Sequence, residues 1–340
     1  MATTNHPKTF ADLYTSLLNN VRADSGKTTI IAEAKRMINS ALHDMHLASG
    51  EHFGWAHRRA TLVTQPEYTT GTLTATKGST AVSGSSTLWD TANDFGVNNV
   101  RVAGKLKIGS SINVYEVSTI TDDTNMVITP MFVDADVAAE DYTYYEDEYA
   151  LASDFLRPID FRFFDQDRSI TLIGETKFRS MFPRNNVTGK PVAAAIFDAA
   201  FSGSTARRRR ILLHKPPSEA YIIPYTYVTT DLGVTSAGAA QTELSSDTDE
   251  PIVPLSYRMA IVHKAAAQWY LERRNDQTRA AANHALYDDT MHKLMGDNEH
   301  GQDLPQIVPN RSGYVRRAAR PYGGPRRHVS GTAFDELRDR

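Results

Sequence analysis

The stretch TTIIAEAKRMINSALHDM, residues 28–45, places apolar side chains at intervals of three and four. Apolar residues at this spacing line one face of an α-helix, so the stretch predicts an amphipathic helix. Residues 8–21 carry the same pattern, and Thr9 followed by Asp12 is typical of a capped helix start. Because residues 24–26, Asp-Ser-Gly, separate the two segments, we expect an αα-hairpin.

The pattern changes after Trp55. Residues 61–146 are rich in Thr, Ser, Gly and Val and fall into short alternating runs. The run TLTATKGSTAVS, residues 72–83, predicts a hairpin that turns at residues 77–79. Further runs follow at spacings of roughly ten residues, which is typical of a small β-barrel or sandwich. We therefore expect an inserted β module here.

Residues 147–232 have mixed character. Residues 211–214 and 220–228 read as a second hairpin-like pair, in which Tyr221, Ile223, Tyr225 and Tyr227 share one face. Since Pro224 has no N–H to donate, we expect its strand to lie at the edge of a sheet.

A long apolar stripe then predicts a helix from Leu255 to Met295, with a break near Asn275-Asp276 and an end at Gly296. The predicted fold class is α+β, with a helical body made of the N-terminal αα-hairpin and the long C-terminal-half helix. This body carries an inserted small β-barrel/sandwich module and an extended C-terminal tail. The expected domains are 1–60, the helical hairpin; 61–146, the β module; 147–297, a mixed region and long helix that complete the body; and 298–340, a basic tail.

The C-terminal segment has its own charge and composition. Residues 305–340 carry a formal charge of +5, whereas the whole chain of 340 residues carries −3. Four prolines and the pair Gly323-Gly324 preclude a continuous helix, so an extended arm on an acidic body is expected. Planar guanidinium groups suit carboxylates as well as phosphates. The candidate residues for docking on a partner are Arg311, Arg316, Arg317, Arg320, Arg326, Arg327, Phe334 and Leu337.

The run Arg207-Arg208-Arg209-Arg210 is the sharpest charge feature. Four adjacent guanidinium groups could form a basic patch that faces phosphates. Alternatively, the side chains are solvated or paired with acidic neighbours, as the net acidic body around them favours.

The chain lacks the residues that several kinds of site require. The chain has no cysteine, which excludes disulfides, thiolate zinc sites, Fe–S clusters and a cysteine nucleophile. Residues 26–29, Gly-Lys-Thr-Thr, resemble the end of a phosphate-binding loop, but Val21 stands where that motif needs glycine. The histidines fit no metal motif either. They are His43, His46, His52 and His57 near the N-terminus, and His284 and His292 beside Asp288 and Asp289.

We therefore expect no enzyme activity, no cofactor and no catalytic metal. No apolar run approaches the roughly 18 residues of a membrane span, and the first residues do not resemble a signal peptide. A protein that is soluble, intracellular at synthesis and without a membrane partner is expected.

The order of the segments is more specific than any motif. A hairpin ends at Trp55 and is followed by residues 59–63, RATLV, and by the Thr-rich stretch. The chain returns through residues 142–155, YTYYEDEYALASDF, and then through residues 211–227, ILLHKPPSEAYIIPYTY. Residues 251–254, PIVP, lead into the Ala-rich helix. Over about residues 9–297, this order resembles the head-to-tail adaptor proteins of tailed bacteriophages, also called connector or head-completion proteins.

The resemblance implies a structural, non-enzymatic virion protein of the phage neck, made in the host bacterial cytoplasm. It implies a homo-oligomeric ring, usually a dodecamer, whose channel passes double-stranded DNA during ejection. The expected partners are further copies of the chain, the portal protein reached by the C-terminal arm, and a tail or tail-nozzle protein. Two alternatives stay open: a DNA-binding protein that uses Arg207–Arg210 and the Arg-rich tail, or another tail or baseplate component.

Overall fold

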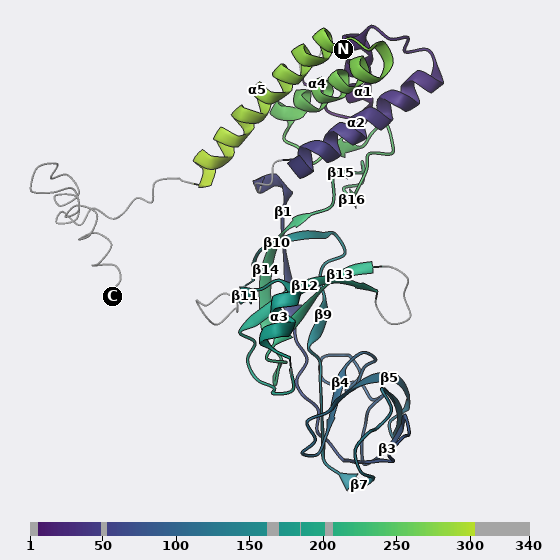
Figure 1. Ribbon diagram of the computed structural model, residues 1–340. Helices are drawn as coiled ribbons and strands as arrows, with labels where there is room; N and C mark the ends of the chain where they lie inside the picture. The colour runs from purple at the N-terminus through teal and green to yellow at the C-terminus, as the bar shows by residue number, and fades with distance from the viewer. Residues whose placement is uncertain (1–5, 49–52, 162–169, 184, 201–206, 303–340) are drawn as a thin grey trace, which may run out of the picture.

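The molecule has helices at one end, a curled β-sheet at the other and two smaller sheets between them (Figure 1). This is a computed structural model. It describes residues 6–48, 53–161, 170–183, 185–200 and 207–302.

The predicted αα-hairpin is confirmed as α1 (Phe10–Val21) and α2 (Thr28–Ala48). The hydroxyl of Thr9 accepts a hydrogen bond from the Asp12 N–H at 3.3 Å, and the Asp12 carboxylate accepts one from the Thr9 N–H at 3.0 Å. This reciprocal cap satisfies two N–H groups that the first turn leaves without a helical partner. The apolar stripes of both helices are buried.

The predicted long helix consists of α4 (Arg258–Trp269), a π-helical turn (Tyr270–Arg274) and α5 (Gln277–Gln302). The expected break is confirmed, because Asn275 adopts a left-handed backbone with φ of 48°. The expected end at Gly296 is wrong, because α5 continues to Gln302. All four helices share one apolar core, so both ends of the described chain build the same unit.

Residues 72–145 form an antiparallel, curled sheet of seven strands. Its order is β7-β2-β3-β6-β5-β4-β8, and the predicted hairpin at residues 72–83 is confirmed as β2–β3. A separate core fills the sheet around fully buried Trp89, whose indole N–H donates to the Tyr142 hydroxyl at 2.9 Å. The strands are β2 (Thr72–Ala75), β3 (Ala81–Ser85), β4 (Lys105–Ile108), β5 (Val114–Asp122), β6 (Asn125–Thr129), β7 (Val137–Glu140) and β8 (Tyr142–Tyr145).

The middle of the molecule is a β-sandwich. One sheet has the order β1-β14-β10 and the other β11-β12-β13-β9, and their facing sides share a third apolar core. The bounds are β1 (His57–Val63), β9 (Glu148–Ala150), β10 (Phe155–Phe161), β11 (Thr171–Leu172), β12 (Ala193–Ala200), β13 (Arg207–His214) and β14 (Ile222–Thr229).

One helix and several short elements complete the fold. The helix α3 (Glu175–Met181) covers the outer side of β12, where Phe178 packs on Ala193 and Ala195. The short elements are η1 (Gly54–Ala56), η2 (Leu255–Tyr257), β15 (Gly233–Val234), β16 (Ala240–Gln241) and β17 (Glu250–Pro251).

The predicted fold class is wrong in its proportions. The chain is 30% helical and 32% strand, with several antiparallel sheets, and is not a helical body with a small inserted module. The misassigned region is residues 147–232, whose strands form most of the sandwich. The domain boundaries at residues 60, 146 and 297 remain predictions.

The expected pairing in this region is also wrong. Strands β13 and β14 belong to different sheets, so residues 211–214 and 220–228 do not form a hairpin. Strand β14 lies at the centre of its sheet rather than at the edge. Pro224 is tolerated there because the β10 ladder reaches Tyr225, and beyond it, among the residues that the structure describes, β14 pairs with β1 alone.

Candidate interaction surfaces

The described residues cover only half of the outer side of the sheet β1-β14-β10. Near the helices, Val228 on β14 belongs to the helical core, and Leu156 and Ile159 of β10 pack against that core. Farther along the same side, within the described part of the chain, the side chains of β1 and β14 become exposed. Alternation along the strands places these side chains opposite the sandwich core.

This exposed half carries apolar residues where a solvated sheet face ordinarily carries polar ones. Val63 and Ile222 are cross-strand partners and are 44% and 51% exposed. Two residues along each strand, and so on the same face, Thr61 pairs with Pro224, and two residues farther on Arg59 pairs with Thr226. We call Arg59, Thr61, Val63, Asp160, Ile222 and Pro224 the open sheet face.

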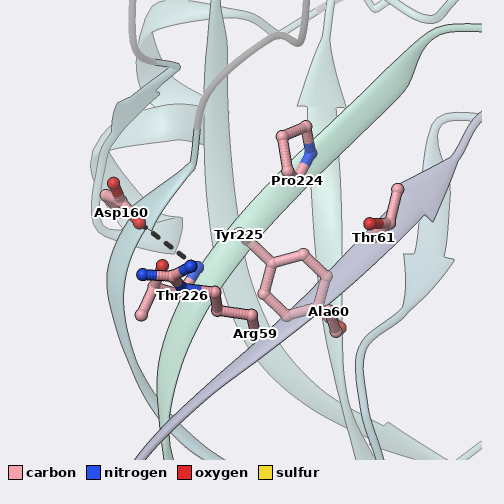
Figure 2. Close-up of a pocket in the computed structure, with 7 residues that line it drawn as sticks. All are labelled: Arg59, Ala60, Thr61, Asp160, Pro224, Tyr225 and Thr226. Atoms are coloured by element: carbon pink, nitrogen blue, oxygen red, sulfur yellow. Dashed lines mark hydrogen bonds between the residues drawn. The ribbon is translucent and has the colours of Figure 1, made fainter. Parts of the chain in front are cut away.

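A hollow of about 430 Å³ lies on the open sheet face (Figure 2). Pro224 and Thr61 lie toward one end of it, whereas Arg59 and Asp160 lie beside Thr226 at the other. The Asp160 carboxylate accepts the Thr226 N–H at 3.2 Å, which holds the carboxylate in place. An apolar strip with one guanidinium and one carboxylate at its end suits a protein partner.

The described arginines of the run do not form one patch. Arg209 and Arg210 are neighbours on β13, so their side chains point to opposite sides of the sheet. Arg209 forms an ion pair with Asp198 at 3.1 Å, and buried Arg210 lies 3.6 Å from the Glu148 carboxylate. These contacts favour the paired alternative for Arg209 and Arg210. The side chains of Arg207 and Arg208 lie outside the described residues.

The predicted docking residues of the tail also lie outside the described residues. They are Arg311, Arg316, Arg317, Arg320, Arg326, Arg327, Phe334 and Leu337.

The histidines near the N-terminus are not brought together as ligands. His46 is buried and its Nε2 lies 2.7 Å from the Thr229 carbonyl oxygen, whereas His43 is exposed and His52 is outside the described residues. Burial lowers the pKa of His46. Among the described residues, no group of three or more His, Cys, Asp or Glu side chains could hold a metal ion.

The other weak motifs have local explanations. Residues 26–29 join the turn after α1 to the start of α2, and the Asp24 carboxylate accepts the Gly26 N–H at 2.9 Å. His284 contacts Asp288 at 2.8 Å within α5. No helix in the described ranges is long and apolar enough to cross a membrane.

A buried polar network joins the seven-stranded sheet to the sandwich. The Arg101 guanidinium binds the Glu146 carboxylate through two nitrogens, with Nε at 2.6 Å from Oε1. The Tyr144 hydroxyl donates to Glu146 at 2.9 Å, and the Tyr149 hydroxyl donates to the Glu146 carbonyl at 3.2 Å. Tyr144 lies on β8, Glu146 directly follows it and Tyr149 lies on β9, whereas Arg101 precedes β4. The network therefore fixes the connection between the two β units.

We expect Arg101→Ala to lower the free energy of unfolding by about 2 kcal/mol, because it leaves a carboxylate without its charged donors. The Glu146 side chain is only 9% exposed, whereas that of Arg101 is 38% exposed, so solvent recovers part of the loss. Urea denaturation measures the change. Arg179, which is exposed and forms an ion pair with Glu175 within α3, provides the control substitution Arg179→Ala. Equal small effects of Arg101→Ala and Arg179→Ala would contradict a structural role for the network.

No protein-family model matches this chain, and no curated protein matches it either.

The sequence alone does not single out the open sheet face as a site. The predicted shared face of residues 220–228 is confirmed, since Ile223, Tyr225 and Tyr227 lie in the sandwich core. The useful signal was on the other face, where Ile222 and Pro224 are apolar as well. A strand that is apolar on both faces is typical of one covered on both sides, and here the second sheet covers one of them.

Proposed function

We propose that the chain is a structural subunit of an adaptor ring in the neck of a tailed bacteriophage. In this proposal the ring joins the portal to the tail, and DNA passes through its channel. The C-terminal arm docks on the portal protein, and a tail or tail-nozzle protein binds below. The order of segments over about residues 9–297 supports this proposal through its resemblance to head-to-tail adaptor proteins.

The observation that carries the proposal is the open sheet face. Val63 and Ile222 are about half exposed side by side on a sheet whose opposite side is a packed core. Contiguous exposed apolar residues on a soluble domain mark interaction sites, so a subunit that works within a larger assembly explains them.

The ion pairs of the arginine run also favour a structural role over DNA binding. Asp198 and Glu148 neutralise Arg209 and Arg210, so these two arginines have little charge left for phosphates. An acidic body suits a channel in which DNA slides, since phosphate-neutralising contacts would retain it.

Negative-stain microscopy and mass photometry of the purified chain, with and without its cognate portal protein, test the proposal. We expect a closed ring of about twelve copies that stacks on the portal. Truncation after Leu304 is the matched variant, which should keep the folded body and lose attachment to the portal. Monomers under both conditions would reject the proposal. Duplex-DNA binding with a steep salt dependence would favour the DNA-binding alternative instead.

A further inference from the structure

The sandwich has unlike outer sides. On one side, α3 covers the sheet β11-β12-β13-β9 through Phe178, which is 1% exposed. On the other side, beyond the part covered by the helical core, no described element lies on the sheet β1-β14-β10. The order of layers is therefore helix, sheet, sheet and an open sheet face.

We infer that α3 of a neighbouring copy packs on the open sheet face, and that this contact repeats around the ring. The inference rests on the proposed ring and names the surfaces that form it. Because α3 and the open sheet face lie on opposite sides of the same sandwich, one contact leaves the second surface of each copy free. Head-to-tail contacts of this kind generate rings when the rotation closes.

The surface of α3 has the properties that the open sheet face needs. Met181 is 52% exposed and offers a flexible apolar side chain to the strip formed by Val63 and Ile222. An unbranched thioether side chain fits an irregular apolar surface such as the hollow beside Pro224 (Figure 2).

The charges on the two surfaces are complementary. Glu175 and Arg179 of α3 contact each other at 2.8 Å, and their side chains are 39% and 71% exposed. On the open sheet face, Arg59 and Asp160 lie at one end of the hollow (Figure 2). Glu175 can approach Arg59, and Arg179 can approach Asp160 beside the contact that its carboxylate makes with the Thr226 N–H, so opposite charges face each other. Such complementarity fixes the register of an interface.

Cysteine cross-linking tests this pairing directly, because the chain has no cysteine of its own. The test variant combines Thr61→Cys on the open sheet face with Met181→Cys on α3. We expect a short bismaleimide to give a ladder of covalent oligomers on a denaturing gel. Thr61→Cys alone and Met181→Cys alone should stay monomeric. The matched control combines Thr61→Cys with Leu88→Cys, which is 47% exposed on the distant seven-stranded sheet unit and should give no ladder.

Each other outcome overturns the inference. A dimer from Thr61→Cys alone would indicate that two open sheet faces meet each other. A monomeric internal cross-link in Thr61→Cys with Leu337→Cys would identify the tail as the occupant. Rings in the microscope without a ladder would reject this contact and leave the proposed function intact. Absence of both rings and ladder would reject the contact together with the proposed function.

A charge substitution supplies an independent measurement. Ile222→Asp should weaken assembly by about tenfold or more, because it places a carboxylate in the apolar strip. Since Ile222 is 51% exposed, the circular dichroism spectrum and melting temperature of the unassembled chain should stay unchanged. Assembly equal to that of the unmodified chain would contradict the inference.

Discussion

Trp89→Ala is expected to lower the free energy of unfolding of the seven-stranded sheet by about 4 kcal/mol. Trp89 is fully buried in that sheet's core, where its ring packs edge-on against that of Tyr142 with 6.1 Å between the ring centroids. The substitution leaves a cavity that the surrounding strands fill only in part. It also leaves the buried Tyr142 hydroxyl without its indole donor.

Hydrogen exchange measures this effect element by element. Because the helical core and the core around Trp89 are separate clusters, protection should fall in β2–β8 and persist in α1 and α2. Phe95→Ala is the matched control, since Phe95 is 50% exposed on the same unit and should change stability by less than about 0.5 kcal/mol. A uniform loss of protection throughout the chain would contradict separate cores.

Asp147→Asn is expected to raise the free energy of unfolding at pH 7.5 by up to about 3 kcal/mol. Asp147 is 6% exposed beside the Arg101–Glu146 network, and its Oδ1 has no hydrogen-bond partner among the described residues. Burial raises the pKa of the Asp147 carboxyl to about 6, and the neighbouring carboxylate of Glu148 adds to the shift. Lys105 and the amide of Asn185 offset part of it.

The sign of the pH dependence follows from this raised pKa. The folded protein holds the Asp147 proton more tightly than the unfolded chain, whose pKa is near 3.8. Its contribution to stability is therefore greatest below about pH 4 and is lost as the pH rises through about 6. The advantage of Asp147→Asn should be large at pH 7.5 and nearly absent at pH 4. Urea denaturation at both values tests this.

Exposed Asp94 gives the control for that experiment. Asp94→Asn should change the free energy of unfolding by less than about 0.5 kcal/mol at either pH. The same gain for Asp147→Asn at pH 4 and pH 7.5 would show that the effect comes from packing rather than from ionisation.

The helices could be predicted from the sequence because their apolar spacing and caps are local. The stripe of residues 28–45, the cap at Thr9 and the break at Asn275 all depend on neighbours within a few positions. The β2–β3 hairpin is local in the same sense. The sandwich could not be assembled this way, because β14 pairs with β1, which lies more than 150 residues earlier in the sequence. The alternation of apolar and polar residues predicts a short strand, but it does not predict which other strand pairs with it.

The candidate sites likewise depend on contacts between segments that lie apart in the sequence. A run of four arginines is conspicuous in the sequence, but the contacts of Arg209 with Asp198 and of Arg210 with Glu148 depend on β12 and β9, which pair with β13 on either side. The open sheet face brings together Val63, Ile222 and Asp160 from three separate segments. No single stretch of the chain contains it.

The helical core is built from α1 and α2 near one end of the described chain and from α4 and α5 near the other, so it is completed late in synthesis. Helices α1 and α2 leave the ribosome about 200 residues before α4 and α5, which at about 5 to 20 residues per second is roughly 10 to 40 seconds. During that interval the apolar side chains of α1 and α2, such as Leu13, Leu17 and Met37, lack the helices α4 and α5 that complete their core. The helical unit, whose first helices are synthesised early, is therefore completed last, and the nascent chain exposes an apolar hairpin until then.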